Sequence, residues 1–319
     1  MKRFGLAALI LISMARVGAA GEVAGAWTAV RYDDPSRGFQ FSLNLDHDGN
    51  VGRGYELSDF TGLTAEQASS ATKTPVTFEL RREAGTVRFD GTFRNGRGAG
   101  DFTFVPDYAF ARKLRDVGVD FDADRGDEDM RLFTLATNDM TIDFITSMQA
   151  IGYRESLEQY IAFRIFRVDP AYVKAMGDVG FKRLSAEKLV ETKIHGATPD
   201  YIREMRAHGE DLSLDGYVQS RIFRVTPEFA DEMRKLGYAS LDHDQLVAFR
   251  IHNVTPEFVS ELRKLGYSKV SADNLLAMRI HGVTPEFIKK ADSAAGHRVS
   301  VDRLIEMRIF NIDPEDADI

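Results

Sequence analysis

The stretch VTPEFVSELRKLGYSKVSADNLLAMRIHG, residues Val254–Gly282, is one copy of a unit that recurs through the last two thirds of the chain. An earlier copy carries Ile142 in place of the proline of this unit, and a divergent first copy begins at Pro106. The proline itself recurs every 28 or 29 residues, at Pro170, Pro199, Pro227, Pro256, Pro285 and Pro314. A fixed period of this length predicts a stacked array of structural repeats.

Each unit carries the signals of two short helices. Thr255 is a good N-cap, and Pro256 follows at the first helical position, where a missing N–H is not needed. Gly266 ends this helix because glycine readily adopts positive φ. Ser271 caps a second helix, which Gly282 ends. Apolar side chains recur between these signals at helical spacing: Phe258, Val259, Leu262, Leu265, Leu275, Leu276, Met278 and Ile280.

The other copies repeat this chemistry. The first cap is Asp169, Thr198, Thr226, Thr284 or Asp313, and the second cap is Ser156, Ser185, Ser213, Asp242 or Ser300. The glycine that ends the first helix is Gly152, Gly180, Gly209, Gly237 or Gly296. Helices of about ten residues are marginal in isolation, so each unit must bury its apolar stripe against its neighbours. We therefore predict an α-solenoid of about seven helical hairpins.

Residues 25–105 have a different pattern, with many glycines and with apolar residues at alternate positions. Alternation predicts half-buried strands, and Asn95-Gly96 between two such runs predicts a tight hairpin. Strands are expected at 26–31, 39–45, 51–57, 76–81, 86–89, 91–94 and 100–105, with a loop or short helix over 59–73. The predicted fold class is α+β, a small antiparallel β domain followed by an α-solenoid of helix–turn–helix repeats.

The N-terminus resembles a secretory signal peptide. Lys2 and Arg3 precede the apolar run Phe4–Met14, and cleavage is expected near Ala19 or Ala20. The run is short for a membrane span, and retention as an anchor is the alternative. We expect three segments, a signal peptide at 1–20, a β domain at 21–105 and the repeats at 106–319. The mature protein is expected to be periplasmic or secreted, without stable membrane insertion.

The composition narrows the possible partners. The chain has a formal charge of −8 and has no block of basic residues, which disfavours nucleic acid as a partner. It has no cysteine, so it forms no disulfide and no thiolate metal site. The sequence also lacks the G-x-S-x-G, H-E-x-x-H and phosphate-loop motifs, so we expect no enzyme activity and no cofactor.

A ladder of basic residues is the main candidate binding feature. One cation lies near the end of the second helix of successive repeats, at Arg164, Lys193, Arg221, Arg250, Arg279 and Arg308. These residues, called here the basic ladder, could form a stripe that binds an acidic partner. The alternative is structural, because a cation near a helix C-terminus interacts well with the helix dipole and with the last carbonyls.

Histidines and acidic residues are weaker candidates for metal sites. His195, His252 and His281 hold one place in their repeats. Neighbouring helices lie about 10 Å apart, too far for these three to share one zinc ion, and an aromatic slot in the packing explains them better. Calcium candidates are Asp46 and Asp48 in one turn and Asp122 and Asp124 in an acidic insertion. The first group lacks the bidentate glutamate of a calcium loop, and a hairpin turn is the alternative there. Arg125 interrupts the second group, for which a solvated loop is the alternative.

The repeat pattern TPEF…LR.LGY…RIHG resembles the C-terminal repeats of bacterial membrane metallopeptidases of the β-lactam-sensor (BlaR-type) family and of related stand-alone secreted proteins of unknown function. Residues 89–93 and 98–104 are similar to the segment before those repeats, and the resemblance covers 76–310. The zinc motif and the membrane helices of that family are missing here. The resemblance implies a non-catalytic module of the cell envelope.

The leading hypothesis is a scaffold that binds another envelope protein through the surface of its repeats. The first alternative is binding of a small ligand, lipid or glycan by the β domain or at its junction with the first repeat. An unrecognised hydrolase is the third hypothesis.

Overall fold

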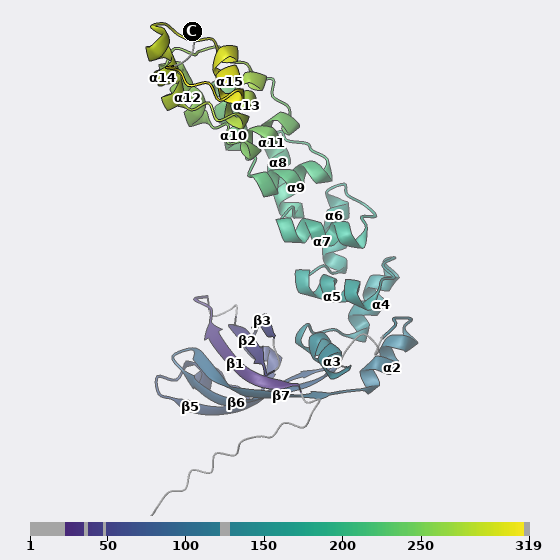
Figure 1. The fold of residues 1–319 in the computed structure, drawn as a ribbon. Coiled ribbons are helices and arrows are strands. Elements are labelled where there is room, and N and C mark those ends of the chain that lie inside the picture. Colours follow the sequence, from purple (N-terminus) through teal and green to yellow (C-terminus); the bar gives the residue numbers. More distant parts are fainter. Residues whose placement is uncertain (1–22, 35–37, 47–48, 122–127, 316–319) are drawn as a thin grey trace, which may run out of the picture. The chain divides into compact units, whose positions relative to one another are not determined.

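The computed structural model describes residues 23–34, 38–46, 49–121 and 128–315 (Figure 1). The chain divides into two compact units, Met1–Pro170, called unit 1, and Ala171–Ile319, called unit 2. The predicted signal peptide, Asp48, Asp122 and Asp124 lie outside the described residues. In the described ranges, no helix is both long enough and apolar enough to cross a membrane. The chain changes from strand to helix after Pro106, so unit 1 contains the sheet together with the first helices.

Unit 1 begins with a seven-stranded antiparallel sheet in the order β3-β2-β1-β7-β6-β5-β4. The strands are β1 Ala24–Arg31, β2 Phe39–Leu45, β3 Asn50–Tyr55, β4 Phe60–Thr61, β5 Thr74–Arg82, β6 Gly85–Arg94 and β7 Arg97–Pro106. The 3₁₀ turn η2 Leu57–Asp59 follows β3, and the predicted loop at 59–73 contains the two-residue strand β4 as well as the short helix α1 Ala65–Ser69. The antiparallel β domain is confirmed, but it consists of two meanders that are joined by pairing of β1 with β7, and the two runs expected at 86–94 form one strand.

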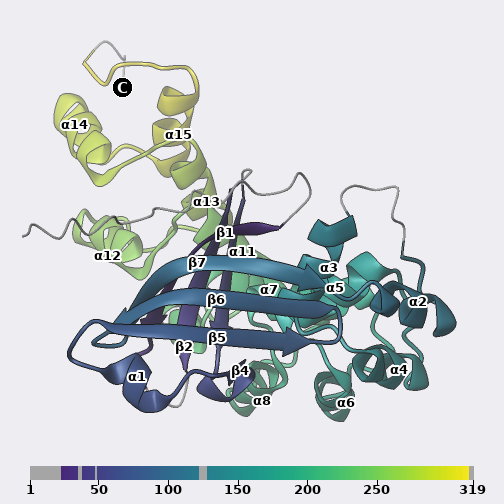
Figure 2. The same cartoon turned by 90° about the horizontal axis from the view of Figure 1, so that it is seen from below.

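The sheet curls around an aromatic core. Figure 2 shows β5, β6 and β7 side by side, with β1 and β2 crossing them. Trp27 is fully buried, and its ring lies 5.4 Å from that of Phe78 and 5.6 Å from that of Phe41. A Cβ at Gly91 would lie 2.8 Å from the Trp27 ring and 2.3 Å from the Ala99 carbonyl oxygen, so only glycine fits there.

Where unit 1 is described, four helices follow the sheet: α2 Ala109–Asp116, α3 Glu128–Thr137, α4 Ile142–Ala150 and α5 Leu157–Phe166. Helix α3 packs on the sheet through Phe133, whose ring stacks on Phe102 at 5.7 Å and meets Phe104 edge-on at 5.4 Å. The Tyr55 hydroxyl donates a hydrogen bond of 3.0 Å to the carbonyl of Thr137, at the end of α3. The first hairpin is therefore joined to the sheet by buried aromatic contacts and by a bond to its last turn.

Unit 2 continues with helical hairpins. Their helices are α6 Pro170–Asp178, α7 Ala186–His195, α8 Pro199–Ala207, α9 Leu214–Phe223, α10 Pro227–Lys235, α11 His243–Ile251, α12 Pro256–Lys264, α13 Ala272–Ile280, α14 Pro285–Ala295 and α15 Val301–Ile309. Within the described residues, α2 to α15 pair in order as seven hairpins, as predicted.

The local signals act as the sequence predicts. The Thr255 hydroxyl accepts a bond of 3.2 Å from the Phe258 amide, and the Ser271 hydroxyl accepts one of 3.1 Å from the Asn274 amide. Gly266 has φ +91°, which ends the first helix in the left-handed region. Each short helix of the unit thus begins and ends at signals carried by its own residues.

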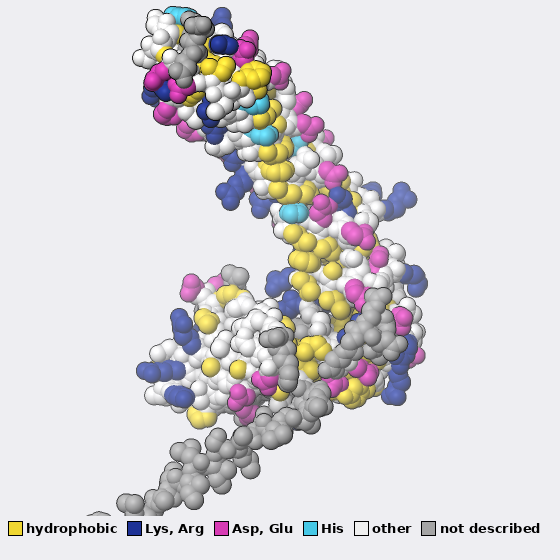
Figure 3. All heavy atoms as spheres, in the orientation of Figure 1, with side chains coloured by type: hydrophobic (Ala, Val, Ile, Leu, Met, Phe, Trp, Pro, Cys, Tyr) yellow, Lys and Arg dark blue, Asp and Glu magenta, His cyan; other side chains and the backbone are white. Residues whose placement is uncertain are grey.

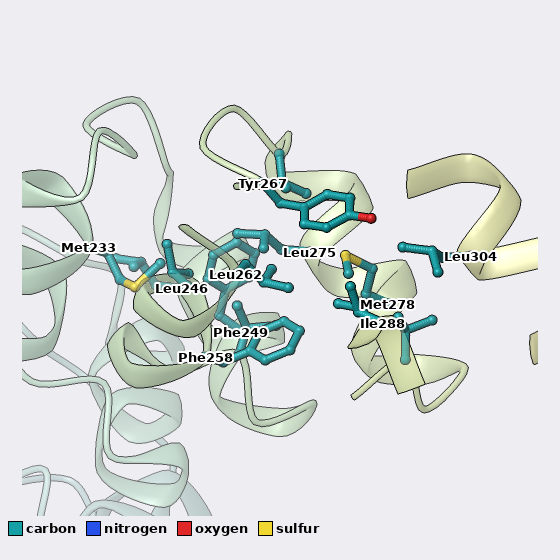
Figure 4. Close-up of a cluster of buried hydrophobic side chains, with 14 of the residues drawn as sticks. Met233, Leu246, Phe249, Phe258, Leu262, Tyr267, Leu275, Met278, Ile288 and Leu304 are labelled. Carbon is teal, nitrogen blue, oxygen red and sulfur yellow. The ribbon is translucent and has the colours of Figure 1, made fainter. Parts of the chain in front are cut away.

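Like helices stack on like helices in unit 2. Contacts join α10 to α12 and α12 to α14 among first helices, and α9 to α11 and α13 to α15 among second helices. Figure 4 shows the resulting core, in which Phe258 and Leu262 of one hairpin face Leu275 and Met278. Since Ile288 and Leu304 of the next hairpin are fully buried in the same cluster, each unit completes the core of its neighbour.

Candidate binding surface of the repeats

The basic ladder connects successive repeats. The Nε–H of Arg250, on α11, donates a hydrogen bond of 3.2 Å to the carbonyl of Phe223. Phe223 is the last residue of α9, the second helix of the preceding hairpin. The Arg250 guanidinium also lies 4.8 Å from the ring centre of Phe229. The same pair of contacts recurs in unit 2 for Arg221 with the His195 carbonyl and Tyr201, Arg279 with the His252 carbonyl and Phe258, and Arg308 with the His281 carbonyl and Phe287.

The two remaining members of the ladder have related contacts. Lys193 places its ammonium 4.0 Å from the ring centre of Tyr172. Arg164, in unit 1, stacks on Phe144 at 5.1 Å, donates to the Asn138 carbonyl at 3.0 Å and pairs with Asp139 at 2.6 Å. The structure thus gives the ladder a structural role, in which each cation binds an aromatic ring and, for the arginines, the end of the preceding repeat.

The metal candidates lie apart from one another. His195, His252 and His281 are at the ends of three different second helices. Asp46 follows β2, where its amide donates a bond of 3.1 Å to the Ala24 carbonyl. Among the described residues, no group of three histidine or acidic side chains is placed to hold a metal ion.

A row of exposed isoleucines is the feature that sequence reasoning missed. Each follows a member of the basic ladder by one residue, and the row in unit 2 consists of Ile194, Ile222, Ile251, Ile280 and Ile309. Their exposed fractions are 52, 45, 51, 51 and 50%. We call these five residues the isoleucine row. In unit 1 the same place is taken by Ile165, which is 43% exposed.

Exposed large hydrophobic side chains of unit 2 are concentrated in the isoleucine row. Among the described residues of unit 2, the exposed large hydrophobic side chains are the five isoleucines and Phe310, which follows Ile309. Figure 3 shows hydrophobic side chains gathered in a band along the helices of unit 2, with histidines beside it. Single exposed apolar residues are ordinary on a protein surface, but a contiguous exposed band marks an interaction site.

An acidic row accompanies the isoleucines. Seven residues before each isoleucine, at the start of the same helix, lies an exposed carboxylate: Glu187, Asp215, Asp244, Asp273 and Asp302. Seven residues are almost two helical turns, so each carboxylate shares a face with its isoleucine about 10 Å away. We call these five residues the acidic row. Unit 2 therefore presents an apolar line beside a row of carboxylates, of which Asp215 is already paired with Lys188 at 2.7 Å.

The sequence contains a signal for this surface. Isoleucine recurs directly after the ladder cation, where a hairpin facing only solvent would favour a polar residue. The apolar helical stripe that predicts the core includes Ile280, because periodicity does not distinguish the edge of a stripe from its centre. The exposed fraction of Ile280, 51%, makes that distinction.

Comparisons with protein-family models, with curated proteins and with solved structures find no match to this chain. The resemblance to the repeats of BlaR-type metallopeptidases therefore stays a prediction.

Proposed function

We propose that this protein is a non-catalytic binding scaffold of the cell envelope, and that unit 2 binds an elongated polypeptide along the isoleucine row. The observation that carries the proposal is the half exposure of the same residue in five successive repeats. A side chain needed only for the core would be buried, and one needed only for solubility would be polar. Exposure of an apolar residue at every repeat is consistent with an occupant that covers all of them.

The interval between successive isoleucines limits the kind of polypeptide that could bind along the row. Packed helices lie roughly 8–10 Å apart, so the isoleucines present contacts at about that interval. Three residues of extended chain span about 10 Å, as do seven residues of helix. A suitable partner carries an apolar side chain at every seventh position of a helix, because residues three apart on a strand point to opposite faces. The acidic row favours lysine or arginine on one side of that segment.

The basic ladder takes a supporting part in this proposal. Its arginines hold consecutive hairpins in register, so they set the interval at which the isoleucines are presented. Removal of a ladder residue should therefore disturb binding through the geometry of the repeats, together with a loss of stability.

Site-specific photo-crosslinking tests the proposal. A photoreactive phenylalanine derivative is placed singly at positions 222, 251 and 280 of the full chain in its own cells. Matched controls carry it at Lys235 and Lys264, which are exposed at the ends of the first helices α10 and α12. We expect one and the same polypeptide to be crosslinked from the three row positions, and no such product from the controls.

A second experiment keeps the crosslinker at position 280 and substitutes a different surface residue. The change Ile251→Asp should abolish the crosslink formed from position 280, while Lys264→Asp should leave it intact. Products of equal yield from row and control positions would show that the row is not the binding surface. Absence of any product from all three row positions would also reject the proposal.

A further inference from the structure

A charged pocket lies within unit 1. It has a volume of about 330 Å³ and is lined from three directions. The sheet contributes Arg53 and Tyr55 of β3 and Arg82 at the end of β5, α3 contributes its last turn, and α5 contributes Arg164. Figure 2 shows α3 and α5 at one end of the sheet. The remaining lining side chains that matter here are Asp59, Asp139, Arg167 and Asp169.

Two of the four arginines are already neutralised. Arg82 lies 2.6 Å from Asp59 and 2.9 Å from Asp139, although its Nε–H is not directed at an acceptor. Arg164 pairs with the other oxygen of Asp139 at 2.6 Å. Asp139 thus bridges the guanidinium groups of Arg82 and Arg164 on one side of the pocket.

The other two arginines keep their charge available. Among the described residues, Arg53 and Arg167 form no ion pair with a carboxylate. The Nε–H of Arg53 donates a hydrogen bond of 3.3 Å to the Thr137 carbonyl. The two terminal NH₂ groups of Arg53 remain available to a ligand. Burial lowers the pKa of Arg53, and the charges of Arg164 and Arg167 lower it further. An anion placed between these groups would offset the desolvation cost of the buried Arg53 charge and the repulsion from Arg164 and Arg167.

We infer that this pocket binds an oxyanion, a carboxylate or phosphate group of a small ligand, held between Arg53 and Arg167. The planar guanidinium presents paired N–H donors that match both groups. Phe144 and Phe163 form an apolar part of the lining, which suits the carbon skeleton of an organic anion. The site belongs to unit 1 and the isoleucine row to unit 2, so the inference does not depend on the proposed function of unit 2.

Binding of simple anions to the purified full chain tests the inference. Inorganic phosphate, acetate and succinate are titrated calorimetrically, each at constant ionic strength so that general screening does not change. We expect saturable binding of at least one anion at one site per chain. A response to phosphate alone identifies a phosphate ligand, and a response to acetate or succinate identifies a carboxylate.

Three variants locate the site. Arg53→Gln and Arg167→Gln should each weaken binding of the responding anion at least tenfold. Arg154→Gln removes the same charge from an exposed position of unit 1 outside the pocket lining, and it should leave binding unchanged within about twofold. If Arg53→Gln fails to fold, Arg167→Gln decides, because Arg167 is exposed.

Two results would overturn the inference. One is the absence of saturable binding for all three anions. The other is equal weakening in Arg154→Gln and Arg167→Gln, which would show a general effect of net charge.

Discussion

At the scale of single residues, positive φ determines where the short helices end. Gly152, Gly180, Gly209, Gly237 and Gly266 have φ between +88° and +101° at the end of the first helix of their hairpins. After the second helix the same conformation is adopted by Arg167, Gly196, Arg224, Asn253, Gly282 and Asn311. The first position is always glycine in these five copies, while the second also accepts arginine and asparagine.

The change Gly237→Val should lower the free energy of unfolding by about 1 kcal/mol or more, because a β-branched residue resists positive φ. Steric crowding does not cause the loss, since a Cβ at position 237 would lie 3.7 Å from its nearest neighbour, the Arg263 guanidinium. Chemical denaturation measures the loss. Gly177→Ala, within helix α6 and free of positive φ, should instead stabilise by roughly 0.5–1 kcal/mol. Equal midpoints for Gly237→Val and the parent would refute the assignment of Gly237 as the helix end.

At the scale of elements, a repeat is joined to the preceding one by a cation as well as by its apolar core. Arg250 extends from α11 to the last carbonyl of α9 and covers the Phe229 ring at the start of α10. Its place near its own helix C-terminus suggests an interaction with its own dipole. The structure shows that the carbonyl it binds belongs to the preceding hairpin.

Arg250→Gln should destabilise the protein by about 1–2 kcal/mol, since it removes a stacking cation and a charged hydrogen bond. Urea denaturation of the variant gives the value. Lys264→Gln removes a charge from an exposed residue of α12 and should change stability by less than about 0.5 kcal/mol. Similar losses in both variants would mean that net charge, rather than the contact between repeats, sets the effect.

At the scale of the whole molecule, glutamates in the first turns of the first helices make the stability of unit 2 depend on pH. The Glu257 carboxylate accepts hydrogen bonds from its own backbone N–H and from the Thr255 hydroxyl, and these bonds lower the pKa of the carboxyl below its usual 4.5. Glu228 and Glu286 show the same shift for the same reason in α10 and α14. A folded pKa below the unfolded one stabilises the protein above about pH 4.5, and this contribution is lost as the pH falls through the folded pKa.

The triple change Glu228→Gln, Glu257→Gln and Glu286→Gln should therefore flatten the fall in melting temperature between about pH 5 and pH 3. Melting curves over that range measure the effect. Glu261→Gln, in the last turns of α12 rather than at a helix start, provides the matched control and should retain the slope of the parent. A triple variant that loses stability as steeply as the parent would show that other groups control the acid transition.

Much of the fold could be predicted because its signals are local. Caps, stop glycines and the 28- or 29-residue period act within a few residues, so the helices begin where Thr255 and Ser271 indicate. The strands were predicted from alternation for the same reason. The order of the strands was not, because pairing of Ala26 with Asp101 joins residues far apart in sequence and depends on how the sheet curls around Trp27.

The candidate sites required the tertiary structure. The sequence placed Arg164 in a ladder, but only folding brings it to Asp139 and to the pocket with Arg53 and Arg82. It also contained the isoleucine row without indicating that Ile251 is half exposed. Sequence by itself determined the repeats, since short-range backbone chemistry specifies each hairpin. Tertiary structure decided which faces stay open and which charges meet, because burial and ion pairing depend on contacts between distant residues.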